Sequence, residues 1–196
     1  MGMAIVRDST KAVNRRELEE RLKSVGDYVK MDLLSSALKK QIDFDTKKFV
    51  LTKLAEIYEA RRMFSEAAKM MRNTAEINTT YDGKMSDFIK SCVLFIKGGN
   101  FDEADVSFTK AMGSATELQK GRLKVTRKDA YKEQGREYLN RDRRSHALEA
   151  YEKLLSIGNK LDAGQIDIPD PSKISNPNHK LTREEKNSAG PLGDIF

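Results

Sequence analysis

The chain has 196 residues, of which 36 are Lys or Arg and 30 are Asp or Glu, so its formal net charge is +6 at pH 7. A single cysteine excludes a disulfide framework and multi-cysteine metal sites, and two histidines leave little material for a zinc enzyme. No apolar run has the length of a signal-peptide core near the start or of a membrane span elsewhere. We therefore expect one domain with a tail, in a soluble cytoplasmic protein without a cofactor.

The predicted elements are all helices. The four prolines lie at positions 169, 171, 177 and 191, so the chain before them can be helical without a proline break. Apolar residues recur at helical spacing and show no sustained period-two alternation, which predicts an all-α fold. Glycines and capping residues give helices over about residues 16–28, 32–41, 46–62, 65–78, 87–97, 102–112, 117–140 and 143–157, with Asp45 or Thr46 capping the third and Ser86 or Asp87 the fifth. Short helices joined by tight turns pack antiparallel, so we expect a row of helical hairpins.

A repeated pair of residues supports the hairpins. Four times an aromatic residue is followed nine positions later by Ala, which we place near the end of the first helix and in the second helix of each hairpin. Where two helices cross closely, one presents a small side chain and the other lays a ring beside it. One turn after each Ala come Gln41, Met71, Phe108 and Tyr151; because only Gln41 is polar, the hairpin within residues 1–44 is the degenerate one. The pairs are Tyr28/Ala37, Tyr58/Ala67, Phe95/Ala104 and Tyr138/Ala147.

The last three predicted hairpins, within residues 45–158, also share residue types at further corresponding positions. It rests on Leu54, Ala55, Tyr58, Phe64, Glu66, Ala67 and Met71; on Cys92, Phe95, Gly99, Phe101, Glu103, Ala104, Phe108 and Ala111; and on Gly135, Tyr138, Ala147 and Tyr151. This pattern resembles the tetratricopeptide repeat (TPR), although Arg144 stands where the other units have Phe64 and Phe101. The resemblance implies a right-handed superhelix whose concave groove binds peptides or proteins. A related hairpin array, of the kind found in vesicle-fusion adaptors, is the alternative architecture.

One known use of the TPR family is not expected here. Members that capture the C-terminal carboxylate of chaperones carry a Lys and an Asn one turn apart on the groove face of a first helix, followed by basic residues on the next repeat. Only the last unit has basic residues at these places. The three equivalent pairs are Thr52 and Glu56, Ile89 and Val93, and Lys132 and Arg136.

The residues that could act in catalysis, one cysteine and a cluster of acids, are explained by structural roles. No HExxH, P-loop, GxGxxG or GxSxG motif occurs. Cys92 lies on the apolar stripe of its helix, and we interpret it as a small buried hydrophobe. Asp102, Glu103 and Asp105 begin a helix, where acids stabilise the positive end of the helix dipole, so we interpret them as capping residues. We therefore expect a protein that is not an enzyme.

The charge is concentrated in one segment. Residues 120–144 contain ten basic and four acidic residues, a net +6 that equals the charge of the whole chain. Within the segment, Lys128, Lys132 and Arg136 recur at every fourth position and form a stripe on one helix face. In one interpretation this face is solvated and pairs internally with Asp129, Glu133 and Glu137, which run alongside.

The other interpretation is a basic binding patch. Its partner would be a protein or acidic peptide, or alternatively the phosphate backbone of RNA, as on a ribosome. Tyr131 and Tyr138 are the only aromatic residues in the segment, so we do not expect a stacking platform for single strands. The candidate partner-binding residues are Lys124, Lys128, Lys132, Arg136, Arg143 and Arg144.

Residues 159–196 form the predicted tail. Their mixture of Pro, Asn, Ser, Gly and charge predicts an extended or disordered segment. Repeat arrays need a polar cap, and we expect part of residues 166–174 to cover the last helix in place of one. Residues 192–196 are a second candidate, as a short docking motif. An array with open ends can also self-associate.

Overall fold

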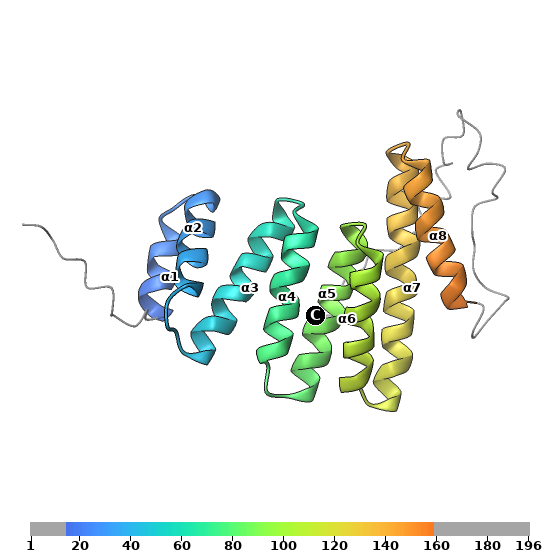
Figure 1. Ribbon diagram of the computed structural model, residues 1–196. Helices are drawn as coiled ribbons and strands as arrows, with labels where there is room; N and C mark the ends of the chain where they lie inside the picture. The colour runs from blue at the N-terminus through green and yellow to red at the C-terminus, as the bar shows by residue number, and fades with distance from the viewer. Residues whose placement is uncertain (1–14, 159–196) are drawn as a thin grey trace, which may run out of the picture.

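The computed structural model describes residues 15–158, and every regular element in this range is an α-helix. Figure 1 shows the helices following one another in chain order as a row. They are α1 (Arg15–Lys23), α2 (Asp27–Leu38), α3 (Phe44–Ala60), α4 (Phe64–Ile77), α5 (Tyr81–Lys97), α6 (Phe101–Ser114), α7 (Glu117–Asn140) and α8 (Arg144–Gly158). None of them is long and apolar enough to cross a membrane. The predictions for residues 159–196, including the covering segment and the docking motif, lie outside the described residues.

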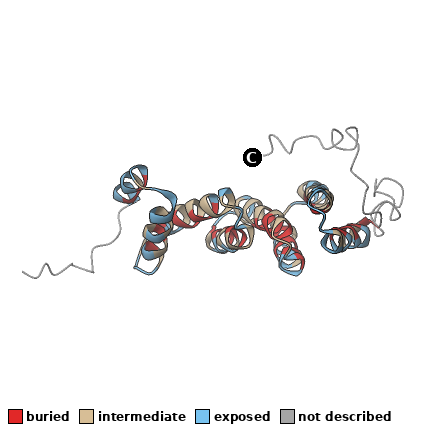
Figure 2. Cartoon of the chain, turned by 90° about the horizontal axis from the view of Figure 1, so that it is seen from above, coloured by how far each residue is buried: buried red, intermediate tan, exposed pale blue. Residues whose placement is uncertain are grey.

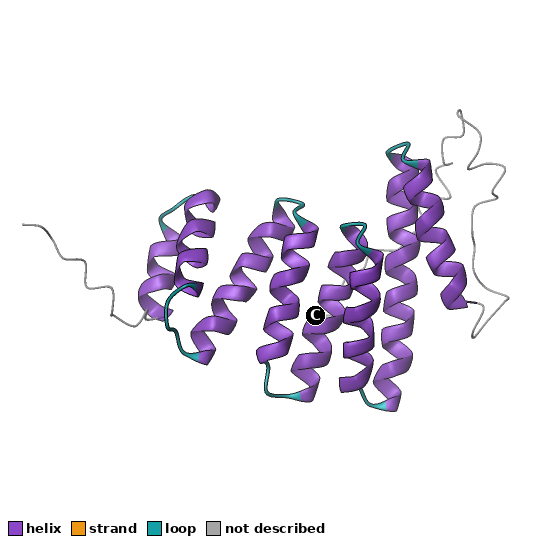
Figure 3. Cartoon of the chain, viewed as in Figure 1, coloured by secondary structure: helices purple, strands orange, loops and turns teal. Residues whose placement is uncertain are grey.

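The helices pack as a row of hairpins from α3 onward. Helix α3 packs against α4, α4 against α5, α5 against α6, and α7 against α8, while α5 also contacts α7. The α3–α4, α5–α6 and α7–α8 connections all lie along one edge of the row, and the α4–α5 and α6–α7 connections lie along the opposite edge (Figures 1 and 3). The predicted all-α fold with packed neighbouring helices is confirmed. We call the first of these edges the hairpin-turn edge.

The three turns on the hairpin-turn edge share one backbone geometry. Their central residues, Arg62, Gly99 and Asp142, have positive φ angles of 59°, 76° and 57°. The following N–H donates to the carbonyl five residues earlier, which is the hydrogen bond of a Schellman C-cap. These bonds join Met63 N to Tyr58 O at 2.8 Å, Asn100 N to Phe95 O at 2.9 Å and Arg143 N to Tyr138 O at 2.8 Å.

This turn explains the nine-residue spacing of the repeated pairs. The donor of the Schellman bond comes five residues after the aromatic residue, and its carbonyl then accepts the N–H of the Ala four residues further on. These bonds reach Ala67, Ala104 and Ala147 at 3.0 Å each. All three alanines are fully buried, as predicted, so the pairs mark where each chain reversal brings two helices together.

The core is divided into a large and a small cluster. The large cluster runs from α3 to α8 and includes Phe95 and Tyr138. The small cluster joins apolar residues of α1, α2 and α3. Half-buried Tyr58 packs against both clusters, as does Met70. Figure 2 shows that buried residues gather on the helix faces turned toward neighbouring helices.

The predicted pairing in the first hairpin is wrong. Tyr28 and Ala37 both lie in α2, because α1 ends at Lys23 and Gly26 is the N-cap of α2. Tyr28 is 71% exposed, and the Arg61 guanidinium lies 3.8 Å from the centre of its ring. Ala37 is buried in the small cluster without an aromatic partner from α1. The nine-residue spacing between Tyr28 and Ala37 therefore does not mark a chain reversal.

Two predicted helix starts are also wrong. The N-cap of α3 is Asp43, whose carboxylate accepts the Thr46 N–H at 3.0 Å. Hydrogen bonds from Thr46 hold the pKa of Asp43 below its usual range. The N-cap of α5 is Thr80, and Asp87 lies inside the helix, where it accepts a hydrogen bond from the Asn78 side chain at 3.0 Å. In both cases an earlier polar side chain satisfies the first-turn N–H groups.

Two glycines of α7 give a matched test of this packing. A Cβ on Gly135 would lie 2.7 Å from Cζ of the buried Tyr151 ring, whereas a Cβ on Gly121 would have no atom within 4 Å. We expect Gly135→Ala to lower the free energy of unfolding by about 1–3 kcal/mol through overpacking. Gly121→Ala should raise it by about 0.5–1 kcal/mol, because Ala favours the helix. Urea denaturation measures both, and equal effects would contradict the close contact of α7 with α8.

Candidate functional site

The structure separates the six predicted partner-binding residues into two groups. Lys124, Lys128, Lys132 and Arg136 follow one another along α7, and we call these four residues the basic stripe. Arg143 lies in the α7–α8 turn and Arg144 is the first residue of α8. The stripe and the turn are therefore distinct surfaces, and Arg144 forms an ion pair with Asp142 at 3.1 Å.

The lysines of the basic stripe are half-buried and carry no ion pair with a described residue. The side chains of Lys124, Lys128 and Lys132 form no ion pair or hydrogen bond with any residue of the range 15–158. The same holds for Asp129 and Glu133, so their expected pairing with the stripe is not formed within that range. Three bound anionic groups could therefore be placed on the stripe without breaking an ion pair of these lysines.

The repeat register explains where the stripe lies. Lys128, Lys132 and Arg136 stand ten, six and two residues before Tyr138, and Met85, Ile89 and Val93 have the same places before Phe95 in α5. In α5 these positions belong to the core: Ile89 is only 6% exposed, and the other two side chains pack against the large cluster. Helix α7, the first helix of the next hairpin, contacts α5. Within the described range no further hairpin follows α8, so no helix takes the corresponding place against α7. The stripe thus occupies the face that a further hairpin would cover.

Helix α7 itself presents no exposed aromatic ring. Tyr131 is fully buried, and Tyr138 is buried in the large cluster. A face that binds single-stranded nucleic acid by stacking requires exposed rings. Helix α7 therefore offers cationic contacts without a stacking surface.

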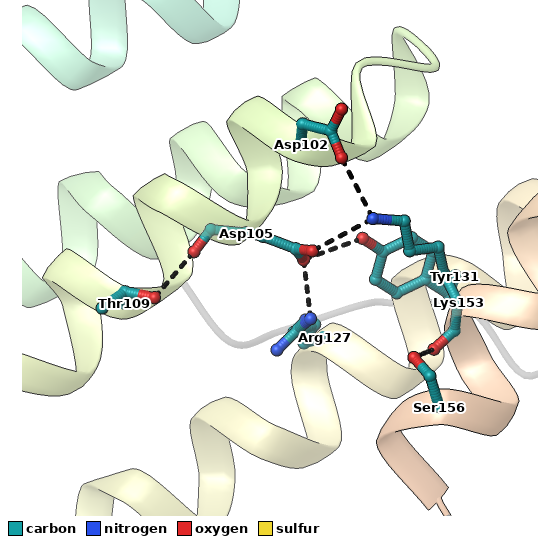
Figure 4. Close-up of polar contacts among 7 residues, drawn as sticks. All are labelled: Asp102, Asp105, Thr109, Arg127, Tyr131, Lys153 and Ser156. Atoms are coloured by element: carbon teal, nitrogen blue, oxygen red, sulfur yellow. Dashed lines mark hydrogen bonds and ion pairs between the residues drawn. The ribbon is translucent and has the colours of Figure 1, made fainter.

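Arg127 belongs to the interior and not to the basic surface. Its side chain is 16% exposed, and its Nη2 lies 2.6 Å from Oδ1 of Asp105. The same carboxylate accepts the Tyr131 hydroxyl at 3.2 Å and lies 3.3 Å from Lys153 Nζ (Figure 4). Asp105 in α6 thus binds donors of α7 and α8, and its interpretation as a capping residue is wrong.

The surroundings shift the pKa of two members of this network, Tyr131 and Lys153. Burial, followed by the negative charge of Asp105, raises the pKa of Tyr131, so its hydroxyl remains a hydrogen-bond donor. A hydrogen bond to Asp102 at 3.1 Å is the main cause that raises the pKa of Lys153, and Asp105 adds to it. The arrangement connects three helices through charge and provides no nucleophile or base in a cleft.

Cys92 is fully buried, as expected from its place on the apolar stripe of α5. Burial raises the pKa of its thiol to about 12. A thiol with this pKa is almost entirely protonated near neutral pH, and the thiolate is the reactive form. The interpretation of Cys92 as a buried hydrophobe is confirmed.

No group of three or more His, Cys, Asp or Glu side chains in the described part of the chain could hold a metal ion. Comparisons of the sequence with protein-family models, with curated proteins and with solved structures found no match. The site is therefore defined by the chain's own geometry: the basic stripe on α7, and the turn region around Arg143.

The Asp105 network gives a stability prediction. We expect Asp105→Asn to lower the free energy of unfolding by about 2 kcal/mol, because the mostly buried Arg127 loses its carboxylate partner. Asp129→Asn removes the same charge from an exposed position on α7 that forms no ion pair with a described residue, and should change stability by less than about 0.5 kcal/mol. Guanidinium denaturation of both variants provides the comparison, and an equal loss in the two would exclude a structural role for Asp105.

The thiol gives a second prediction. At pH 8, Ellman's reagent should modify Cys92 of the folded protein at least about 100-fold more slowly than in 6 M guanidinium, because the native thiol is both inaccessible and protonated. The absorbance at 412 nm follows the reaction. A native rate close to the denatured rate would show that α5 is not packed as described.

Proposed function

We propose that this protein is a non-enzymatic protein-binding module, built as a TPR-like superhelix, that holds an acidic segment of a partner protein along the basic stripe. The observation that carries the proposal is that Lys124, Lys128 and Lys132 form no ion pair within the described range. By contrast, Lys120, Arg127 and Arg141 of the same segment each pair with a carboxylate. The three hairpins with one turn geometry support the TPR-like architecture.

The spacing of the stripe suits an extended acidic segment. Side chains four residues apart on a helix lie about 5–6 Å from each other, so the stripe presents regularly spaced cations along α7. Carboxylates of a partner can each approach one lysine. Such contacts contribute mainly to the rate of association and to specificity, and they weaken as salt is added.

An acidic protein segment fits this face better than RNA does. The exposed carboxylates Asp129 and Glu133 stand on the same helix as the stripe and repel any anion placed beside them. The separate carboxylates of a flexible peptide can be spaced to avoid them, whereas the phosphates of a backbone are continuous. The absence of an exposed ring on α7 removes the stacking contribution. RNA or ribosome binding through residues 120–144 remains the alternative that the experiment must distinguish.

A charge-reversal experiment tests the proposal. We expect the double variant Lys128→Glu/Lys132→Glu to lose at least tenfold of the partner captured from the native cell extract. The matched control Lys39→Glu/Lys47→Glu reverses two exposed lysines in the α2–α3 region and should capture as much as the unchanged protein. Quantitative mass spectrometry compares the captured proteins, and thermal melting checks that both variants fold.

Nuclease treatment and salt separate the two partner classes. Capture of a protein should survive nuclease and should decrease only moderately between 50 and 200 mM salt. Capture that disappears with nuclease and falls by orders of magnitude over that salt range would establish the RNA alternative. Equal capture by the double variant and its control would exclude the basic stripe as the binding surface.

A further inference from the structure

A pocket lies on the hairpin-turn edge, where all three turns contribute. Its volume is about 390 Å³, and it is lined by Arg62, Met63, Phe64, Ser65, Glu66, Lys97, Gly98, Gln134, Tyr138, Arg141 and Arg143. The α3–α4 turn and the start of α4 form one wall, the end of α5 forms another, and α7 with the α7–α8 turn forms the third. It is distinct from the basic stripe, with which it shares no residue.

The residues that line this pocket carry a net positive charge. Its lining contains four cations, Arg62, Lys97, Arg141 and Arg143, and one carboxylate, Glu66, which is paired with Lys69 at 2.8 Å. Two further carboxylates stand at its border: Glu137 pairs with Arg141 and lies 3.5 Å from Arg62, and Glu59 lies 3.8 Å from Lys97. Arg143 has no ion pair with a residue of the described range. An anion in the pocket therefore meets an excess of cations.

A buried amide without a hydrogen bond lines the same pocket. Gln134 is only 6% exposed, yet its side chain forms no hydrogen bond with any described residue. The hydroxyl of the buried Tyr138 likewise has no hydrogen-bond partner in the described range. The polar atoms of both side chains keep some accessible surface, so these groups can form hydrogen bonds with a molecule that enters the pocket.

The start of α4 adds hydrogen-bond donors. Its N-cap, Met63, provides no side-chain acceptor for the first-turn N–H groups, and residues 63–66 line the pocket. The Ser65 hydroxyl accepts a hydrogen bond from Asn100 at 2.7 Å, which leaves its own hydrogen to donate. Gly98 keeps this corner open, because a Cβ there would lie 2.8 Å from Ser65 Oγ and 3.2 Å from Ser65 N. A helix N-terminus with free N–H groups stabilises a bound anion.

We propose that this pocket binds a phosphate monoester. Arginines, a helix N-terminus and neutral amide and hydroxyl donors together match the three oxygens and the double charge of such a group. The volume exceeds that of a phosphate alone and leaves room for the group that carries it. The carrier is a phosphorylated side chain of a protein or a small phosphorylated metabolite, which share this chemistry. The inference goes beyond the proposed function, because it concerns a different surface.

Isothermal titration calorimetry of the full chain tests the site with four probes: inorganic phosphate, glycerol 3-phosphate, a five-residue phosphoserine peptide and its unphosphorylated twin. All three phosphate probes should bind and the unphosphorylated peptide should not. Tighter binding of the phosphopeptide assigns a protein source, and tighter binding of glycerol 3-phosphate assigns a metabolite. Absence of binding by every phosphate probe at 10 mM would overturn the proposal.

Variants locate the binding. Arg143→Gln should weaken phosphate-probe binding at least tenfold, and Gln134→Leu at least threefold, whereas the control Arg122→Gln removes an exposed arginine elsewhere on α7 and should change nothing. Lys128→Glu/Lys132→Glu should also leave phosphate binding unchanged, so failure of one proposal does not imply failure of the other. The probe that binds most tightly should raise the melting temperature of the unchanged protein but not of Arg143→Gln. Undiminished binding by both Arg143→Gln and Gln134→Leu would place the phosphate elsewhere and overturn the site.

Discussion

A residue in the left-handed region closes each of the three hairpins from α3 to α8, and the packing of the described chain depends on this turn. Its Schellman hydrogen bond ties the second helix to the carbonyl of an aromatic residue in the first. The following Ala is thereby brought to the crossing point, where only a small side chain fits. Glycine occupies the left-handed position once, while Arg62 and Asp142 occupy it at a cost of about 1 kcal/mol each relative to glycine. Because three turns of one kind lie along one edge, the side chains that follow them converge there.

The distribution of charge follows from the same architecture. Helix α5 contacts α4, α6 and α7, and its residues at the positions equivalent to the basic stripe, Met85, Ile89 and Val93, are apolar. Helix α7 has Lys128, Lys132 and Arg136 at those positions, and within the described chain no helix covers them. A charged outer face keeps a repeat array from adding further copies of itself, and in our proposal it is the face that an acidic partner binds. Arg127, in the same run of basic residues, points inward and binds Asp105. Proximity in sequence thus says little about which cations reach solvent.

The sequence predicted the features that depend on local spacing. The helices from α3 to α8, the buried alanines and the buried Cys92 follow from apolar periodicity and from turn residues such as Gly98 and Gly99. The prediction for Tyr28 is wrong because nine-residue spacing alone does not locate a turn, and Gly26, the N-cap of α2, places Tyr28 in the same helix as Ala37. The sequence did not identify Asp43 and Thr80 as N-caps, because several neighbouring polar residues could each cap the helix. Only the backbone geometry shows which side chain accepts the first-turn N–H groups. The hydrogen bonds of the Asp105 network join residues 22 to 51 positions apart, and the pocket at the hairpin-turn edge brings together residues from three separate hairpins. Local spacing in the sequence cannot predict contacts between residues so far apart.

Amide hydrogen exchange followed by NMR tests the repeated turn most directly. The N–H groups of Met63, Asn100 and Arg143 each lie just outside a helix and would exchange rapidly in an open loop. If the three Schellman bonds form, these amides are protected by at least about 100-fold relative to an unstructured peptide. Exchange of all three at the rate of an open loop would show that the hairpins do not share this turn and that the array is not built as described.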